Sequence, residues 1–201
     1  MRGWEQYKRD FLESINAFDF DENIIQIISD SVKHKQTIFV CGNGGSASIS
    51  NHMACDFSKI ANNNLRENRY KIMSLVSDVN ILTAISNDNS FDDVFSEQLL
   101  SHSKKNDILI LISSSGNSPN IVKALNAAKQ IGLITIGICG FDGGYLFDNS
   151  DYKAYVNCNQ YGIVEDIHSV FAHFLSYTLK EIDKRENALP TTNQLLTWRR
   201  T

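Results

Sequence analysis

Polar and apolar residues follow one another along the chain in blocks that predict strands and helices in turn. Five short runs dominated by apolar residues predict strands near 37–41, 72–76, 108–112, 133–138 and 152–157. Between and after them, apolar residues at helical spacing predict helices near 46–60, 79–86, 91–102, 118–130 and 163–184. Such alternation is typical of a doubly wound α/β fold, in which helices cover both faces of a five-stranded parallel sheet.

Two more amphipathic helices are predicted ahead of the first strand. One covers residues 4–17, with aromatic residues on a single stripe, and the other begins near Asp21. The sheet can cover one of these helices, which leaves the stripe of the other for a partner subunit. We therefore expect a single domain over residues 1–185, N-terminal helices included, and a C-terminal tail over 186–201 in which the periodic pattern is lost.

Composition narrows the class of protein. The chain has 201 residues, of which 42% are hydrophobic and 21% charged, and this fits one globular domain with a full core. The formal net charge of −4 argues against a nucleic-acid partner, which usually requires a basic face. No apolar run approaches the ~20 residues of a membrane span, and the N-terminus has no apolar signal-peptide core. We expect a cytoplasmic protein without membrane contact.

A glycine-rich turn follows the first predicted strand. Gly42, Asn43, Gly44 and Gly45 come directly after it, and Ser46 begins the next helix. A strand, a glycine turn and a helix in this order bring backbone N–H groups to an anionic ligand. The turn also fits the loose dinucleotide-binding pattern Gly-x-Gly-x-x-Ala, but the acidic residue expected ~20 positions later is missing.

A hydroxyl-rich turn follows the third predicted strand and is the stronger signal. It consists of Ser113, Ser114, Ser115, Gly116, Asn117 and Ser118. A helix cap would need only one of these serines. Four hydroxyl groups before a helix N-terminus favour a phosphate site instead. Together with the glycine turn, they indicate one phosphorylated ligand held between strand ends.

Two pairs of possible metal ligands stand out. His52 and Asp56 are four residues apart on the helix after the glycine turn, so they share one face. Glu165 and His173 are eight apart on the last helix and lie roughly on one side of it. An imidazole and a carboxylate from each helix can form a four-ligand metal site. A solvated helix face is the alternative explanation for each pair.

The remaining histidines and the cysteines are interpreted as structural residues, either packed in the interior or exposed at the surface. His168 comes three residues after Glu165 and is expected to be packed inside the protein, whereas His34 and His102 are expected at the surface. The cysteines are far apart, without a Cys-x-x-Cys motif, and are expected to be buried, reduced thiols. They are Cys41, Cys55, Cys139 and Cys158.

The glycine and serine turns together resemble the paired signatures of the sugar isomerase (SIS) fold. Within that fold the chain is most similar to the sedoheptulose 7-phosphate isomerases, also called phosphoheptose isomerases. The resemblance runs from about residue 20 to 182. It includes Asn87 and Asp88, the glycine turn at 140–144 and the last helix.

The resemblance implies a homotetramer with its sites at subunit interfaces, a bound zinc ion, and conversion of sedoheptulose 7-phosphate to D-glycero-D-manno-heptose 7-phosphate by an enediol mechanism. It implies substrate contacts for Asn43, Gly44, Gly45, Asn87 and Asp88, and phosphate contacts for Ser113, Ser114, Ser115 and Ser118. The metal ligands would be His52, Asp56, Glu165 and His173, of which Asp56 and Glu165 would also touch substrate. The catalytic groups would be Asp56, Glu165 and His173.

Two positions depart from the best-known members of the family, which have Glu at position 56 and Gln at position 165. Asp56 is one methylene shorter, and a shift of ~1 Å can cost about a hundredfold in rate. Glu165 adds a charge and a possible base. Either the proton shuttle has moved from position 56 to position 165, or the substrate differs. The alternatives are an isomerase of another sugar phosphate, or a non-catalytic SIS protein that binds a sugar phosphate or associates with a replication initiator.

Overall fold

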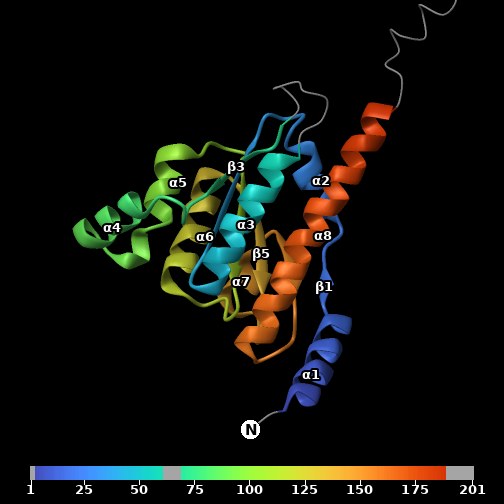
Figure 1. Cartoon of the computed structure of the whole chain (residues 1–201). Helices are drawn as coiled ribbons and strands as arrows, with labels where there is room; N and C mark the ends of the chain where they lie inside the picture. Colours follow the sequence, from blue (N-terminus) through green and yellow to red (C-terminus); the bar gives the residue numbers. More distant parts are fainter. Residues whose placement is uncertain (1–2, 61–68, 189–201) are drawn as a thin grey trace, which may run out of the picture.

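The sheet of the computed structural model, which describes residues 3–60 and 69–188, is six-stranded and mostly parallel (Figure 1). Its strand order is β1-β6-β5-β4-β2-β3. Five strands run parallel to one another. They are β2 (Thr37–Gly42), β3 (Lys71–Ser74), β4 (Ile108–Ser113), β5 (Ile134–Cys139) and β6 (Tyr152–Tyr155). These are the five strands that the apolar runs predict.

The sixth strand is a difference from the prediction of a five-stranded, all-parallel sheet. β1 (Asp19–Phe20) pairs antiparallel with β6, and the backbone N–H of Asp21 continues the pairing with a 2.9 Å bond to the carbonyl of Lys153. Two residues are too few to show the alternation of a strand, so the sequence pattern could not reveal them. The sheet is therefore mixed, with an antiparallel strand at one edge.

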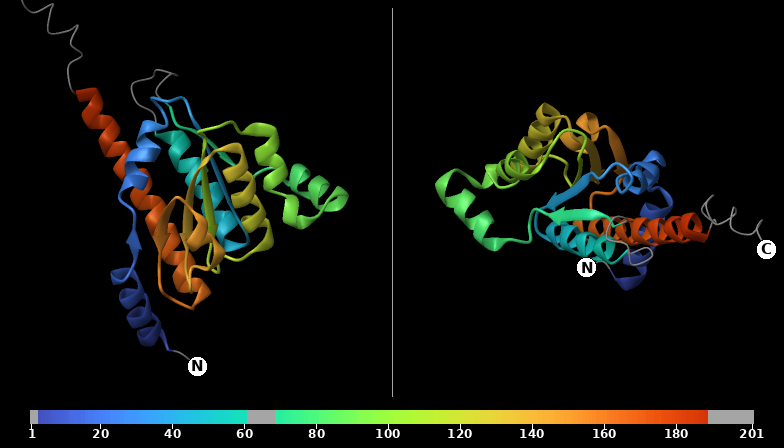
Figure 2. Two further views of the ribbon diagram at one scale, coloured as in Figure 1. Left: turned by 180° about the vertical axis from the view of Figure 1, so that it is seen from behind. Right: turned by 90° about the horizontal axis from the view of Figure 1, so that it is seen from above.

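Helices cover both faces of the sheet, as predicted (Figure 2). On one face lie α2 (Asn23–Asp30), α3 (Gly45–Lys59) and α8 (Tyr161–Ala188), packed on Ile38 and Val40 of β2. On the other lie α5 (Ser96–His102), α6 (Pro119–Ile131) and α7 (Gly144–Asn149), packed on Phe39 and Cys41. Successive side chains of a strand point to opposite faces, so one apolar strand supplies both cores.

The predicted helices at 79–86 and 91–102 are present with small differences, and one additional helix was not predicted. α4 (Val79–Asp88) stands out on the side of the molecule opposite α8 (Figures 1 and 2). The predicted helix at 91–102 is divided into a short 3-10 turn, η2 (Phe91–Asp93), and α5. The glycine turn near residue 141 leads directly into α7, which the sequence analysis did not predict. The tail predicted at 186–201 lies outside the described residues from 189 onward.

The N-terminal helix α1 (Trp4–Asn16) packs against the first turns of α8 (Figure 1). The Tyr7 hydroxyl donates a 2.8 Å hydrogen bond to Asp166 on α8, and this bond raises the pKa of Tyr7. Trp4 and Leu12 remain 69% and 58% exposed beside a mostly apolar hollow of about 320 Å³. Trp4 and Leu12 of the predicted stripe are therefore still uncovered in the single chain.

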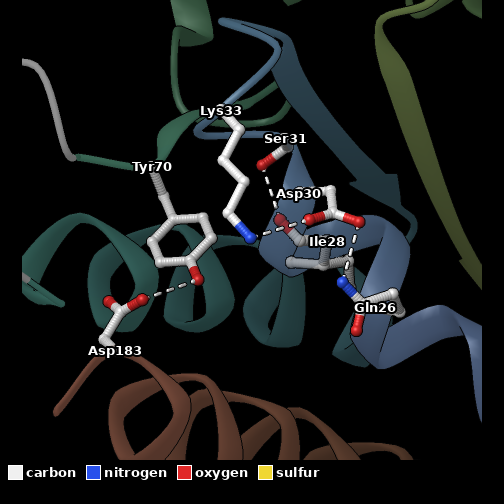
Figure 3. Close-up of polar contacts among 7 residues, drawn as sticks. All are labelled: Gln26, Ile28, Asp30, Ser31, Lys33, Tyr70 and Asp183. Atoms are coloured by element: carbon white, nitrogen blue, oxygen red, sulfur yellow. Dashed lines mark hydrogen bonds and ion pairs between the residues drawn. The ribbon is translucent and has the colours of Figure 1, made fainter. Parts of the chain in front are cut away.

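Polar contacts are found at the end of α2 and between the start of β3 and α8 (Figure 3). Asp30 at the end of α2 accepts bonds from Gln26 (2.7 Å) and Lys33 (3.2 Å), which lower its pKa. The buried Tyr70 hydroxyl points toward Asp183 of α8, 3.4 Å away. The first two contacts are local to the end of α2, and only the Tyr70–Asp183 contact joins two distant segments, the chain before β3 and α8.

The cysteines form no disulfide, and two of them are placed as expected. Cys41 and Cys139 are buried in the sheet, and burial raises the pKa of the Cys139 thiol to about 12. Cys158 is half-buried, and Cys55 is exposed on α3, so the expectation of burial is wrong for Cys55. Within residues 3–60 and 69–188, no helix combines the length and the apolar character that crossing a membrane requires.

Candidate functional site

The glycine turn and the serine turn lie next to each other at the carboxyl edge of the sheet. Gly42 at the end of β2 pairs with Ile112 of β4. From β2 the chain goes to β3 on one side and then returns to β4 on the other, so the two strands flank the point where the strand order reverses. Ligands of open α/β sheets bind at this point.

The glycines of the first turn are required by its geometry. Gly44 has a φ of +54°, in the region that side chains with a Cβ seldom adopt. A Cβ on Gly42 would overlap Ser46, and a Cβ on Gly45 would overlap the carboxylate of Glu165. The turn thus brings the first residues of α3 directly against α8.

The serine turn is fixed by its own hydrogen bonds and by the segment after β5. The Gly116 N–H donates to the hydroxyl of Ser113 at 3.2 Å, and the carbonyl of Gly116 accepts from Leu146 of α7 at 3.0 Å. A Cβ on Gly116 would overlap the carbonyl of Gly143, so the two segments cross at close range. Ser118 begins α6 without a side-chain cap bond, which leaves its hydroxyl available to a ligand.

An amide pair joins the two turns. The Nδ2 of Asn43 donates to the Oδ1 of Asn120 at 2.8 Å, and the Nδ2 of Asn120 donates to the Oδ1 of Asn43 at 2.9 Å. Asn120 is only 1% exposed and lies in the first turn of α6. The pair fixes the orientation of the Asn43 amide relative to the serine turn.

A small cavity of about 90 Å³ opens between these elements. Its lining includes the four serines of the serine turn, together with Tyr161 and Glu165 from the first turns of α8. The complete lining is Asn43, Ser46, Ile112, Ser113, Ser114, Ser115, Ser118, Tyr161 and Glu165. The cavity therefore combines hydroxyl donors with a carboxylate that can move a proton.

The predicted metal ligands are only partly assembled. His52 and Asp56 of α3 and His173 of α8 gather ligand atoms within 4.8 Å of one another. The Nε2 atoms of the two histidines are 3.4 Å apart, and His52 Nε2 is 3.5 Å from Asp56 Oδ2. Glu165, the fourth predicted ligand, instead lies in the cavity against Gly45.

The donor set fits a zinc ion. Two nitrogens bound to one tetrahedral zinc at about 2.0–2.1 Å are about 3.4 Å apart, which matches the separation of these imidazoles. Two imidazole nitrogens and one carboxylate are the ligands of many catalytic zinc sites, in which the fourth position is open to substrate. The same distance also allows a hydrogen bond between the two rings.

Comparison with known proteins identifies the family of this chain. Residues 6–140 match the family model described as "SIS domain". Phosphoheptose isomerase of Campylobacter concisus is 31% identical over 88% of this chain and 93% of the relative. The chain belongs to the phosphoheptose isomerase family of SIS-domain proteins.

Solved structures share the fold of this SIS-domain chain. Phosphoheptose isomerase from Neisseria gonorrhoeae superposes with a TM-score of 0.73 at 26% identity, over 88% of this chain and 90% of the other. The Francisella tularensis phosphoheptose isomerase gives a TM-score of 0.77 at 24% identity, over 90% and 100%. The resemblance and the fold class inferred from the sequence are both confirmed.

Two predicted substrate residues of this SIS-domain chain lie elsewhere. Asn87 and Asp88 are exposed at the end of α4, and neither lines the cavity. Their only bond to each other runs from Asn87 Nδ2 to Asp88 Oδ1 at 2.9 Å. The single chain thus brings together the glycine turn, the serines and Glu165, and separately the histidines with Asp56, but not α4.

Sequence reasoning missed Tyr161 and Asn120. Tyr161 is one helical turn before Glu165, and this spacing alone could have placed it on the same face. Nothing in the local pattern marks Asn120, because its partner Asn43 is 77 residues away.

His168, as expected, is fully buried. Neither of its ring nitrogens has a hydrogen-bond partner of good geometry among the described residues. Burial lowers the pKa of the His168 imidazole to about 4, and the backbone of Cys139 offsets part of that effect. His34 and His102 are exposed, as predicted.

Proposed function

We propose that the protein is an aldose–ketose isomerase that converts sedoheptulose 7-phosphate to D-glycero-D-manno-heptose 7-phosphate. The observation that carries the proposal is the cavity that is lined both by the four serines of the serine turn and by Glu165. Membership of the phosphoheptose isomerase family supports this substrate. His52 on α3 and His173 on α8 lie close to Asp56, and these residues supply the remaining groups for proton transfer and metal binding.

The phosphoryl group binds among Ser113, Ser114, Ser115 and Ser118. Hydroxyl groups and the N-terminus of α6 are suited to a phosphate dianion. The sugar carbons then run past Asn43, Gly44 and Gly45 and past Glu165 toward His173.

Glu165 takes the proton from the carbon next to the carbonyl, and the electron pair forms the enediol. The proton then returns to the neighbouring carbon. His173 transfers the hydroxyl proton between the two oxygens. Asp56 lies in the histidine group, with Lys59 3.5 Å from its carboxylate, and we assign it to metal and substrate binding.

His52, Asp56 and His173 would hold a zinc ion, and Glu165 would join them only by leaving its place against Gly45. A zinc ion bound there supplies a positive charge that stabilises the negative charge developing on substrate oxygen. The cysteines form no disulfide, which fits a reducing compartment, and we place the reaction in the cytoplasm.

The active protein is a homotetramer with its sites at subunit interfaces. Asn87 and Asp88 lie on α4, away from the cavity of their own chain, so a neighbouring chain's α4 would supply them to the sugar. The uncovered apolar side of α1, with Trp4 and Leu12, supports contact between chains. No nucleic acid or membrane takes part.

The test is turnover of sedoheptulose 7-phosphate together with measured metal content. Ser118→Ala and Ser115→Ala should each raise KM by tenfold or more, since each removes a hydrogen bond to a charged group. Unchanged KM in both variants would contradict the phosphate site. Binding of the sugar phosphate without turnover by metal-loaded protein would favour the alternative, a non-catalytic SIS protein.

A further inference from the structure

Tyr161 occupies a distinct place relative to the cavity. It is the first residue of α8, and Glu165 follows one turn later, so both side chains line the same cavity. Along the helix the order is Tyr161, then Glu165, then His173. Tyr161 is therefore at the end of this row that is farthest from the histidines, where the proposed function puts the phosphoryl group.

The Tyr161 ring is held in place although 62% of the residue is exposed. It packs edge-on against Phe141, with ring centroids 4.7 Å apart and planes at 75°. The backbone of Phe141 is itself anchored, because its N–H donates to Cys158 at 3.0 Å and its carbonyl accepts from the Tyr155 hydroxyl at 2.7 Å. Phe141 has a φ of +51°, a conformation that persists only where the surroundings fix it.

The Tyr161 hydroxyl has no hydrogen-bond partner in the part of the chain that the structure describes. Four of the other six tyrosine hydroxyls donate to protein groups: Tyr7 to Asp166, Tyr70 to Asp183, Tyr145 to Asn126 and Tyr155 to Phe141. Tyr161 thus has a positioned ring and an available donor at a cavity that five serines also line.

We propose that Tyr161 is a substrate-binding residue whose hydroxyl donates a hydrogen bond to the phosphoryl group held by the serine turn. The inference rests on the phosphate site of the proposed function, but not on the isomerisation. The phosphoryl oxygens accept the bond, and the aromatic ring covers the mouth of the cavity and excludes water from it. Phe141 is the positioning residue, since its ring fixes the direction of Tyr161.

The experiment compares Tyr161→Phe with a matched variant of the same helix, Tyr177→Phe, whose side chain is 69% exposed and does not line the cavity. Binding of inorganic phosphate is measured by calorimetry on the full chain, and KM and kcat are measured with sedoheptulose 7-phosphate. Tyr161→Phe should weaken phosphate binding and raise KM by about tenfold each, with kcat within about twofold of the parent. Tyr177→Phe should change none of the three.

Phe141→Leu tests the positioning role. It keeps the Tyr161 hydroxyl but removes the ring partner, so it should reproduce part of the loss in phosphate binding. Unchanged phosphate affinity in Tyr161→Phe would overturn the proposal, as would a loss of the same size in Tyr177→Phe. If the parent binds phosphate through Tyr161 but turns over no sedoheptulose 7-phosphate, the inference stands and the proposed reaction fails.

Discussion

Asn43 and Asn120 exchange two hydrogen bonds, of 2.8 and 2.9 Å, between the loop after β2 and the first turn of α6. Each amide uses one donor and one acceptor on the other. The pair thus joins the loop after β2 to the start of α6, although the two asparagines are 77 residues apart in sequence. The pair is buried on the Asn120 side, where an unsatisfied group is costly.

Asn120→Asp should disrupt this pair. The carboxylate keeps the acceptor but faces the Oδ1 of Asn43 with a second oxygen, so we expect unfolding free energy to fall by about 1–3 kcal/mol. KM should rise because Asn43 is no longer held. Urea denaturation and steady-state kinetics measure both. Asn126→Asp on the same helix is the control, since it keeps the acceptor for Tyr145. An equal loss of unfolding free energy in this control would contradict a special role for the Asn43–Asn120 pair.

The two carboxylates should respond differently to conversion to amides. Glu165→Gln should lower kcat by about a hundredfold or more, because an amide cannot take a proton, while metal content stays at the parent level. Asp56→Asn should act mainly through loss of metal, since it removes the anionic member of the His52 and His173 group. Turnover and bound metal are measured for both. An active, metal-loaded Glu165→Gln enzyme would return the role of base to Asp56.

Metal binding should depend on the histidine pair. His52→Ala and His173→Ala should each reduce the metal content of purified protein to background, because two ligands of three no longer form a zinc site. Elemental analysis measures it, and dialysis against a chelator should inactivate the parent until zinc is restored. The exposed His102 gives the control variant, His102→Ala. Full metal content in both test variants would exclude this site.

The free energy of unfolding should depend on pH through the protonation of His168. The unfolded chain takes up a proton near pH 6.5, but the folded chain does so only near pH 4, so a falling pH favours unfolding between these values. One pKa unit corresponds to about 1.4 kcal/mol, which gives a loss of roughly 3 kcal/mol over this window. In His168→Leu this component should disappear from denaturation curves recorded from pH 4 to 7. An unchanged slope would mean that another group causes it.

Assembly should depend on the exposed side of α1. Replacing both Trp4 and Leu12 with Glu should lower the mass measured by light scattering at micromolar concentration from that of a tetramer, since charges would enter an apolar contact. Lys129→Glu, at an exposed position on α6, changes the surface charge in another layer and should leave the mass unchanged. A monomeric parent would refute the tetramer itself.

The sequence was sufficient to predict those features that depend on residues close to one another in the chain. The strands followed by Gly42–Gly45 and by Ser113–Ser118 predicted two turns at the carboxyl edge of the sheet, and the spacing of His52 and Asp56 predicted a shared helix face. The parallel sheet follows from apolar runs separated by helices. Each of these signals lies within a few residues, where backbone geometry alone determines which groups meet.

What the sequence could not show depends on contacts between distant segments. The pairing of Asp19–Phe20 with β6 becomes visible only once the sheet exists. Glu165 lies eight residues from His173, and the spacing did not indicate that it would lie against Gly45 rather than with the histidines. Likewise, the position of Asn87 on an outlying helix gives it no role in its own chain's cavity.

The crossing of the serine turn with the segment that starts α7 has a thermodynamic consequence. Gly116 and Gly143 leave no room for a side chain between them, and Leu146 bonds the carbonyl of Gly116. The serine turn is therefore already ordered before any ligand arrives, and binding of the proposed phosphate would not have to offset the conformational entropy of ordering it. A small phosphorylated fragment should consequently retain a large share of the affinity of the whole substrate.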